Sequence, residues 1–481
     1  MNNRIFILLA LLTLSLHSFG QKTYSLEEVI DIAKSNSPAY KAAETRKENR
    51  YWQYRVFKSQ YVPQLSLQGT IPRFNRSVEP VPQPDGTTDF LPVFRSDSDI
   101  RLELQQQVGL TGGTVFINSS LNRFDNFSED VYSYGGDPLS IGFRQPLFAF
   151  NALKWDKKIE PLRYEESKRE FVEEFESISK EASRLYFDLL RAQISLQIAL
   201  KNLGNNDTIY KIAEGRYQLG KIPENELLQL ELSLMNSRQA VAQSKLDLET
   251  NQLSLKSYLG LSNQDQLTLI IPESIPEFDI DPDKALEEAL NNRQEAIGFE
   301  RRLLEADRGV AQAKGETGLN VNVFGSFGLT NNASTLPDIY ARPEDQQRLQ
   351  LGFSIPIVDW GRQKARVKTA AANYQLVQYT VEQEKVNFSQ EVYTQVRTLE
   401  MLRDQVKITQ KADEISQRRY EIAKNRYLIG KISITDLSIA LTEKDQAKRD
   451  YISSLGNFWQ AYFNLRQLTL YDFEADRRLI E

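Results

Sequence analysis

The sequence predicts a mainly α-helical protein with β-strands, built as an internal two-fold repeat. Three observations support this prediction: long stretches without proline, short segments in which apolar and polar residues alternate, and matching motifs in the two halves. The 481 residues carry 59 Lys and Arg against 65 Asp and Glu, a net charge of −6, with no cysteine and one histidine.

The first twenty residues have the pattern of a secretory signal peptide. Arg4 precedes an apolar run from Ile5 to Leu16, and small residues end the segment at Gly20. A positive start, a short hydrophobic core and a small-residue cleavage site define such peptides. We therefore expect an exported mature chain that begins at Gln21.

The composition removes several classes of function. The only histidine, His17, lies in the predicted signal peptide. The mature chain then has no His or Cys for a metal site, a Cys nucleophile or a Ser-His-Asp triad. Because the chain has no cysteine, disulfides and a lipidated N-terminal Cys are also excluded. The excess of acidic residues does not provide the basic surface that nucleic-acid binding requires. We predict no enzyme, no cofactor, no metal and no nucleic-acid partner.

Proline placement predicts very long helices. No proline lies between Pro161 and Pro223, and none follows Pro356. Proline inside a helix costs about 3 kcal/mol, so these stretches permit long helices. The segment 151–219 would span about 100 Å as a helix at 1.5 Å per residue.

Apolar residues inside these stretches recur at heptad spacing. One frame runs from Leu185 to Leu203 in alternating steps of four and three, and another runs from Leu227 to Tyr258. This spacing is typical of coiled-coil seams. We expect the long helices to pack side by side.

The proline-rich stretches predict strands. Apolar and polar residues alternate over 64–71 and 319–330, which indicates strands with one apolar and one polar face. A third segment, 100–121, predicts a hairpin that turns at Thr111-Gly112-Gly113. Such strands suit either a sandwich or a transmembrane barrel.

The two halves of the chain match at two offsets. At an offset of 256, residues 62–69 fall on 318–325, and at an offset of 210, residues 212–222 fall on 422–432. The offsets differ by 46 residues, which predicts an insertion of that size in the first copy, within 69–141. A repeat of this length is a duplicated domain-sized unit rather than a solenoid.

Each unit is expected to run helix, strand pair, very long helix, glycine turn and long helix. Ser25 with Glu28 predicts a capping box at the first helix, and Asp281-Pro282 predicts an N-cap followed by proline. The predicted division is a signal peptide at 1–20, a first repeat at 21–270 (strands about 62–148, long helices about 151–260) and a second repeat at 271–481 (strands about 318–358, long helices about 361–468).

These features together resemble the TolC-like outer membrane factor family, also called outer membrane efflux proteins. The motifs are Leu26-Glu27-Glu28-Val29-Ile30-Asp31-Ile32-Ala33-Lys34-Ser35-Asn36-Ser37-Pro38, Gln145-Pro146-Leu147-Phe148, Pro356-Ile357-Val358-Asp359-Trp360-Gly361-Arg362, and the Arg-Tyr-x-x-Gly-Lys-Ile turns at 216–222 and 426–432. Their order, duplication and spacing cover essentially all of the mature chain.

The resemblance implies an exit duct of a tripartite efflux pump or a type I secretion system. It implies a homotrimer in the outer membrane that extends into the periplasm and is not lipidated. The strands would complete one transmembrane β-barrel against outer membrane lipid, four from each chain. The long antiparallel coiled-coil-like helices would form a periplasmic α-barrel. The implied partners are a periplasmic adaptor (membrane fusion) protein and an inner-membrane pump of the RND or ABC type.

The two glycine turns are the first candidate site. Each glycine is expected to close a helix in the left-handed conformation. In the family these turns form the periplasmic tip that meets the adaptor. The residues expected at that contact are Gly220, Lys221, Ile222, Gly430, Lys431 and Ile432.

Glu226 and Asp436, six residues beyond each glycine, are the candidate gate. Asp436 lies three residues after Ser433, so it also suits a helix cap. In a trimer each residue would form a ring of three acids, which favours cations, and the family carries an acidic gate at the position of Asp436. A further acid in well-known members is replaced here by Ile439.

Two questions stay open from the sequence. The hairpin from Ile100 to Leu121 either adds barrel strands or forms an extracellular cap. A pore-less secreted or periplasmic coiled-coil scaffold or adhesin would also explain the heptads, but it does not need duplicated amphipathic strands. Aromatic residues near strand ends, among them Phe324 and Trp360, are expected to border the lipid-facing band.

Overall fold

The computed structural model describes residues 23–262 and 267–480. The predicted signal peptide, 1–20, lies outside these described residues. The chain divides into two compact units, and each unit combines stretches from both predicted repeats. Within the described residues, the helical unit comprises 23–48, 167–262, 267–296 and 385–480, and the sheet unit comprises Asn49–Glu166 and Ile297–Glu384.

The main helices occur in pairs of equal length. The pairs are α2 (Leu26–Asn36) with α6 (Pro282–Asn292), 11 residues each; α3 (Pro38–Ser59) with α7 (Gln294–Gly315), 22 each; α4 (Ala152–Gln218) with α9 (Arg362–Leu428), 67 each; and α5 (Glu224–Leu259) with α10 (Ile434–Thr469), 36 each. The very long helix predicted over 151–219 is present as α4, with Pro161 inside it. Among the described helices, none is both long and apolar enough to cross a membrane.

The predicted helix starts are confirmed. The backbone N–H of Ser25 donates to the Glu28 carboxylate at 2.9 Å, and the N–H of Glu28 donates to Ser25 Oγ at 3.2 Å. Asp281 accepts from the N–H of Asp283 at 3.0 Å, with Pro282 at the first helical position. Both arrangements satisfy amide groups that the first helical turn leaves without a partner.

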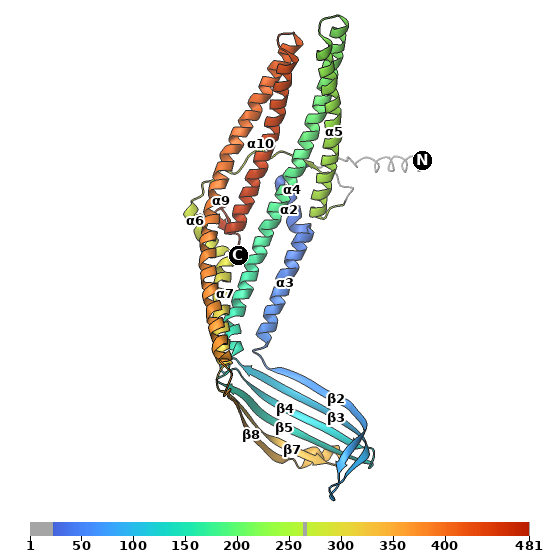
Figure 1. Ribbon diagram of the computed structural model, residues 1–481, viewed down its shortest axis with the longest axis vertical. Helices are drawn as coiled ribbons and strands as arrows, with labels where there is room; N and C mark the ends of the chain where they lie inside the picture. Colours follow the sequence, from blue (N-terminus) through green and yellow to red (C-terminus); the bar gives the residue numbers. More distant parts are fainter. Residues whose placement is uncertain (1–22, 263–266, 481) are drawn as a thin grey trace, which may run out of the picture. The chain divides into compact units, whose positions relative to one another are not determined.

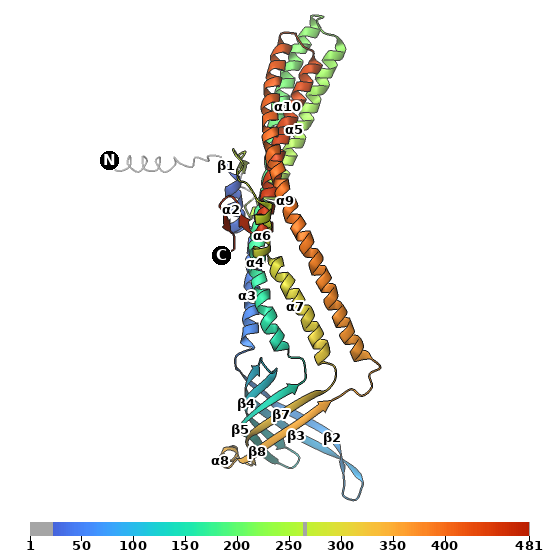
Figure 2. The same cartoon turned by 90° about the vertical axis from the view of Figure 1, so that its left-hand side faces the viewer.

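The helical unit contains two pairs of long helices, α4 with α5 and α9 with α10 (Figures 1 and 2). Residues of the predicted heptad frames are buried, for example Leu189 at 0% and Leu234 at 5% exposure. A short parallel pair, β1 (Thr23–Tyr24) with β6 (Thr268–Leu269), lies beside this core. The central members of the core are Val29, Ala33, Tyr186, Leu189, Leu255, Leu259, Ala289, Val392, Val396, Leu399, Ile452, Leu455 and Phe458.

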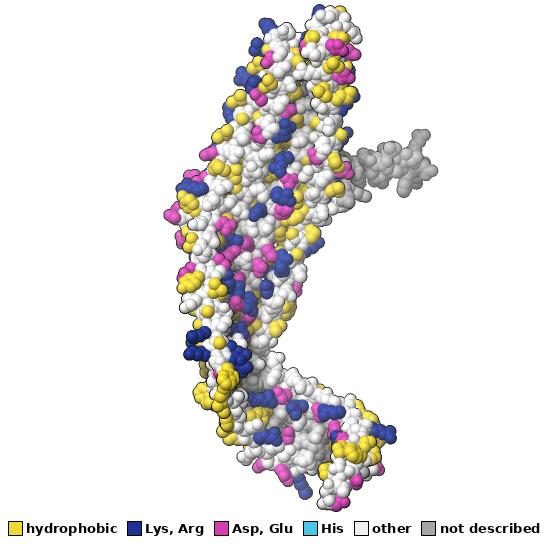
Figure 3. Space-filling view, in the orientation of Figure 1, with side chains coloured by type: hydrophobic (Ala, Val, Ile, Leu, Met, Phe, Trp, Pro, Cys, Tyr) yellow, Lys and Arg dark blue, Asp and Glu magenta, His cyan; other side chains and the backbone are white. Residues whose placement is uncertain are grey.

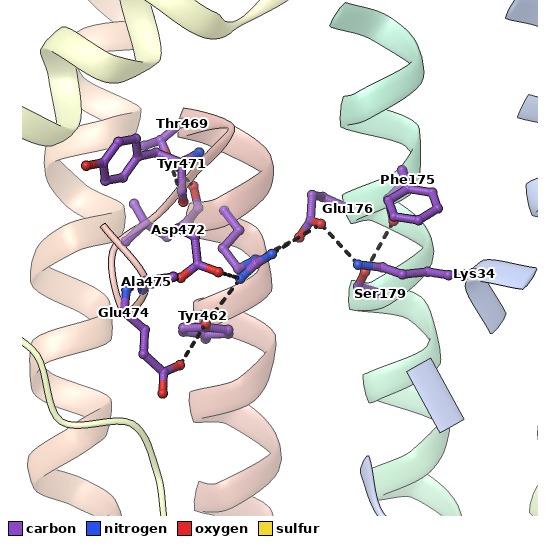
Figure 4. Close-up of polar contacts among 12 residues, drawn as sticks. Lys34, Phe175, Glu176, Ser179, Tyr462, Thr469, Tyr471, Asp472, Glu474 and Ala475 are labelled. Carbon is purple, nitrogen blue, oxygen red and sulfur yellow. Dashed lines mark hydrogen bonds and ion pairs between the residues drawn. The ribbon is translucent and has the colours of Figure 1, made fainter. Parts of the chain in front are cut away.

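A buried ion network joins four elements of the helical unit (Figure 4). The Glu176 carboxylate on α4 accepts from Arg466 Nε at 2.9 Å and from Lys34 Nζ at 3.2 Å. Arg466 on α10 also pairs with Asp472 on β9 (Tyr471–Asp472), which pairs with β10 (Arg477–Arg478). The Lys34 ammonium on α2 lies 4.5 Å from the centroid of the Phe175 ring. The network therefore connects α2 and the C-terminal strands to α4.

The sheet unit holds an antiparallel six-stranded sheet in the order β2-β3-β4-β5-β7-β8 (Figure 1). The short helix α8 (Leu336–Ala341) lies in the connection between β7 and β8 (Figure 2). The strands are β2 (Gln64–Pro82), β3 (Thr88–Val108), β4 (Gly113–Asn126), β5 (Val131–Leu147), β7 (Asn320–Ala333) and β8 (Glu344–Ser354).

The hairpin predicted over 100–121 is confirmed as part of β3 and β4. The two strands pair from Arg95 opposite Asn126 to Val108 opposite Gly113. They lie between β2 and β5 in the sheet. The inserted residues are thus strands of the main sheet and not a separate layer.

Candidate functional site

A short turn with a central glycine joins each pair of long helices. Gly220 and Gly430 have φ angles of 66° and 72°, a left-handed conformation that glycine adopts without steric cost. The N–H of Lys221 donates to the Arg216 carbonyl at 2.9 Å, and the N–H of Gly220 donates to the Tyr217 carbonyl at 2.8 Å. This pair of bonds is the Schellman motif, and the second turn repeats it. The predicted left-handed glycine caps are confirmed.

The turn residues differ in how far their side chains are exposed. Lys221 and Lys431 are exposed, whereas Ile222 and Ile432 are half-buried. Apart from the adjoining residues of the chain, no atom of the described residues lies within 4 Å of the position that a Cβ would take at either glycine. Each turn therefore offers an exposed lysine side chain and an open backbone surface.

A small apolar cluster holds the ends of the two helix pairs together. Tyr427 and Leu437 are 6% and 2% exposed, and Ile209 of α4 packs against their cluster. Arg216 Nη2 donates to the Leu428 carbonyl at 3.4 Å, and its guanidinium lies 5.9 Å from the Tyr427 ring centroid. The end of α4 is thus fixed to the end of α9.

Asp436 forms a capping box at the start of α10. Its N–H donates to Ser433 Oγ at 3.2 Å, and its carboxylate accepts from the Ser433 hydroxyl at 2.8 Å and from the Ser433 N–H at 3.1 Å. These bonds from the Ser433 side chain and backbone hold the pKa of Asp436 below its usual range, because they favour the charged form. The predicted capping role is confirmed, and the carboxylate is exposed and ionised at neutral pH.

Glu226 has the equivalent position in α5 but a different environment. The helix begins after Pro223, which provides no side-chain cap. Glu226 is half-exposed, and its charge contributes to the raised pKa of the nearby buried Tyr427, after the larger effect of burial. Unlike Asp436, Glu226 therefore takes no part in a capping box. Ile439 is 48% exposed, so an apolar side chain stands where the family pattern has an acid.

A buried ion pair in α10 was missed from the sequence. Lys444 Nζ lies 2.9 Å from Asp445 Oδ1, and both side chains are 7% exposed. The Lys444 ammonium lies 4.6 Å from the Tyr420 ring centroid, and Asn202 of α4 donates to Asp445. Because the burying residues come from α4 and α9, no local pattern in α10 indicates this pair.

The sheet has one apolar face that crosses strand after strand. Leu65 lies opposite Leu104, Leu104 opposite Ile117, Ile117 opposite Ile141, and Ile141 opposite Phe327. These five side chains are 37% to 66% exposed in the single chain. A continuous apolar surface of this kind marks a contact with protein or lipid. Other exposed members of the face are Leu67, Ile100, Leu102, Val115, Leu139, Phe143, Leu349, Leu351 and Phe353.

The opposite face is polar. The sheet unit in Figure 3 shows Lys, Arg, Asp and Glu side chains spread among other polar groups. On this face the Arg144 guanidinium lies 4.8 Å from the Phe116 ring centroid and 5.9 Å from that of Phe324. Phe324, expected beside the lipid band, instead lies on the polar face because the two-residue period places it with Asn322 and Ser326. No local pattern predicts the Arg144 cluster, because the contacts of Arg144 with the two rings depend on the register of three strands.

Several solved structures share the fold of this chain. The CmeC outer membrane channel of Campylobacter jejuni aligns with a TM-score of 0.67 and 18% identity, covering 92% of this chain and 85% of that chain. VceC of Vibrio cholerae aligns with a TM-score of 0.63 and 14% identity, covering 92% of this chain and 95% of that chain. The open MtrE channel of Neisseria gonorrhoeae aligns with a TM-score of 0.61 and 15% identity, covering 92% of this chain and 88% of that chain. No curated protein sequence gives a significant match. The fold is the mixed helix and strand fold of TolC-like outer membrane channels.

The family follows from the sequence match. A family model described as outer membrane efflux protein matches residues 101–261 and 285–469, more than half of the chain. The chain belongs to this family, so the resemblance drawn from its motifs is confirmed. It is an outer membrane efflux duct of a tripartite system, and the family and the structural neighbours are channels rather than enzymes.

Proposed function

We propose that three copies of this chain close one barrel in the outer membrane and continue as a helical tunnel into the periplasm. The observation that carries the proposal is the two-faced sheet with free edges at β2 and β8. Lipid tolerates no open sheet edge, because unpaired N–H and C=O groups have no partner there. The edges therefore pair with further copies, and the apolar face meets lipid.

The repeated helix lengths support the proposed tunnel. Helices of 67 and 36 residues occur twice in one chain. Three copies would supply a ring of similar helix pairs, an α-barrel through which cargo passes without a catalytic step. Residues 1–20 would direct export and then be removed, and the mature chain would not be lipidated.

Mass measurement of the detergent-extracted protein tests this assembly. We expect a species of three chains that resists dissociation in mild detergent and fractionates with the outer membrane. A stable, folded monomer in the membrane fraction would contradict the proposal, since a single six-stranded sheet leaves both edges open.

We propose that the glycine turns meet the adaptor, which in turn connects to an RND or ABC pump. The exposed Lys221 and Lys431 and the open glycine backbone support this role. The described residues contain no cysteine, so Lys431→Cys introduces a single crosslinking site. It should capture an adaptor in cells, whereas Ile408→Cys, at a 69% exposed position within α9, should not. Equal capture at both sites would contradict a contact at the tips.

Glu226 and Asp436 are proposed as two acidic rings of the gate. The ionised, exposed Asp436 and the half-exposed Glu226 support this role. Glu226→Gln and Asp436→Asn remove charge, and asparagine still accepts capping hydrogen bonds. The double variant should be less cation-selective in planar bilayers. Identical reversal potentials in asymmetric salt would leave Asp436 with its capping role alone.

A further inference from the structure

We propose that the barrel of this duct has eighteen strands, six from each of three copies. The family resemblance implies twelve. The inference rests on the proposed trimer and adds a statement about the pore itself. Its basis is the place of the β3–β4 hairpin in the sheet.

The hairpin is the difference between the two halves of the chain. The first two helices of each half are offset by 256 residues, and the two long helices by 210. The missing 46 residues therefore lie between β2 and β5. In the second half β7 pairs directly with β8, from Asn320 opposite Ser354, whereas β3 and β4 separate β2 from β5.

The inserted strands continue both faces of the sheet. On β3, Ile100, Leu102 and Leu104 are 37% to 43% exposed. Leu104 lies opposite an apolar residue on each neighbour, Leu65 and Ile117, while Leu102 lies opposite Leu67 on β2 and Ile100 opposite Leu121 on β4. Arg101 and Glu103 alternate with them and align with the polar residues of the same neighbours. A cap outside the membrane has no need of this alternation, but a lipid-facing strand requires it.

The size of the insertion also preserves strand direction. Neighbouring strands in this sheet are antiparallel, so adding two strands leaves the directions of β2 and β5 unchanged. With six strands, β2 and β8 run in opposite directions. The β8 edge of one copy can then pair antiparallel with the β2 edge of the next copy, and the ring closes with one uniform pattern.

The extra strands widen the opening. With strands about 4.8 Å apart and tilted by about 40°, twelve strands give a barrel about 24 Å across and eighteen give about 36 Å. Barrels of 16 to 18 strands leave an open aqueous channel. The membrane portal of this duct would then be about half again as wide as the family pattern implies.

Cysteine labelling distinguishes barrel strands from a cap. Leu102→Cys and Glu103→Cys lie next to each other on β3, on opposite faces. Leu351→Cys and Gln350→Cys form the matched control pair on β8. A water-soluble maleimide applied to outer membranes should label Glu103→Cys and Gln350→Cys at least tenfold faster than their apolar neighbours, because lipid excludes the reagent.

The labelling has three outcomes, and they distinguish a failure of the eighteen-strand inference from a failure of the proposed barrel. Alternation on both strands supports eighteen strands. If labelling rates alternate on β8 but are equal at the two β3 positions, the inference is overturned and the proposed barrel is still supported. Equal labelling within both pairs contradicts the barrel itself. Cryo-electron microscopy of the trimer gives an independent count, and a twelve-stranded barrel would overturn the inference.

Discussion

Two residues with left-handed backbone turn the chain at the ends of its longest helices. Gly220 and Gly430 have open space around the Cα, so packing places no restriction on a side chain there. Only the backbone conformation requires glycine, because the left-handed region is about 1–2 kcal/mol higher in free energy for other L-residues. This distinguishes the turns from helix positions where glycine is merely tolerated.

Replacing Gly220 by valine should therefore loosen the first tip. Hydrogen exchange of amides around the turn should speed up by about tenfold, since 1.4 kcal/mol is a factor of ten, and export should fall. Gly215→Val is the matched control, because Gly215 lies inside α4 with equally open space. Valine is a better helix residue than glycine. Equal effects of the two changes would show that the left-handed conformation is not what matters.

The buried phenol of Tyr462 should make the stability of the helical unit depend on alkaline pH. Burial raises the pKa of its phenol to about 12, although nearby Arg466 favours the charged form. The unfolded value is about 10. Stability that is fully present below pH 10 should therefore be lost as pH rises through 12, by up to about 3 kcal/mol.

Thermal unfolding followed by circular dichroism between pH 9 and 12 measures this effect. Tyr462→Phe should reduce the pH dependence, leaving the part due to the buried Tyr258, whose pKa burial also raises to about 12. Tyr379→Phe, at a position 68% exposed, should leave it as in the natural chain. An unchanged slope in Tyr462→Phe would assign the alkaline loss to other groups.

At the scale of the element, the sheet depends on glycines that make room for aromatic rings. A Cβ at Gly142 would lie 2.4 Å from the Phe116 ring and 2.6 Å from the Gly325 carbonyl oxygen. A Cβ at Gly325 would lie 2.6 Å from the Phe143 ring. The rings lie over neighbouring strands and cover glycine backbone, which is one way in which sheets fix their register.

Gly142→Val should therefore disrupt β5 and block assembly. Gly352 occupies the same position in the second repeat, yet the nearest atom to its Cβ position is 3.9 Å away. Gly352→Val should be tolerated. The fraction of protein recovered as outer membrane trimer measures both changes. Equal recovery of the two variants would contradict the role given to the Phe116 ring.

At the scale of the whole chain, the ion network brings distant sequence together. Glu176 and Arg466 are 290 residues apart and lie in contact. The Glu176 side chain is 3% exposed and that of Arg466 is 14% exposed. Without Arg466, Glu176 keeps only Lys34, and the buried Asp472 loses its ion-pair partner. Leaving a buried charge without its ion pair costs far more than losing a surface pair.

Arg466→Met should accordingly destabilise the helical unit by about 3–5 kcal/mol. Arg397→Ala removes a surface pair with Glu400, at 56% and 38% side-chain exposure, and should cost about 0–1 kcal/mol. Chemical unfolding monitored by helical signal compares them. Similar losses in both variants would mean that Lys34 alone satisfies Glu176.

The sequence by itself determined the features that depend on neighbouring residues. Proline-free stretches and heptads predicted α4, the Ser25 and Asp281 caps predicted two helix starts, and the repeat offsets predicted an insertion of 46 residues. These signals are local because helix hydrogen bonds, caps and strand alternation involve residues a few positions apart. The adaptor contact and the acidic gate stay predictions.

The tertiary structure alone decided which residues meet across the chain. It placed the inserted hairpin inside the main sheet, assembled Arg144 with two rings from other strands, and buried Lys444 with Asp445. Each of these depends on strand register or on helices far apart in sequence. Alternation predicts that a strand has two faces, but only pairing decides which strands lie beside it, and hence how wide the barrel can be.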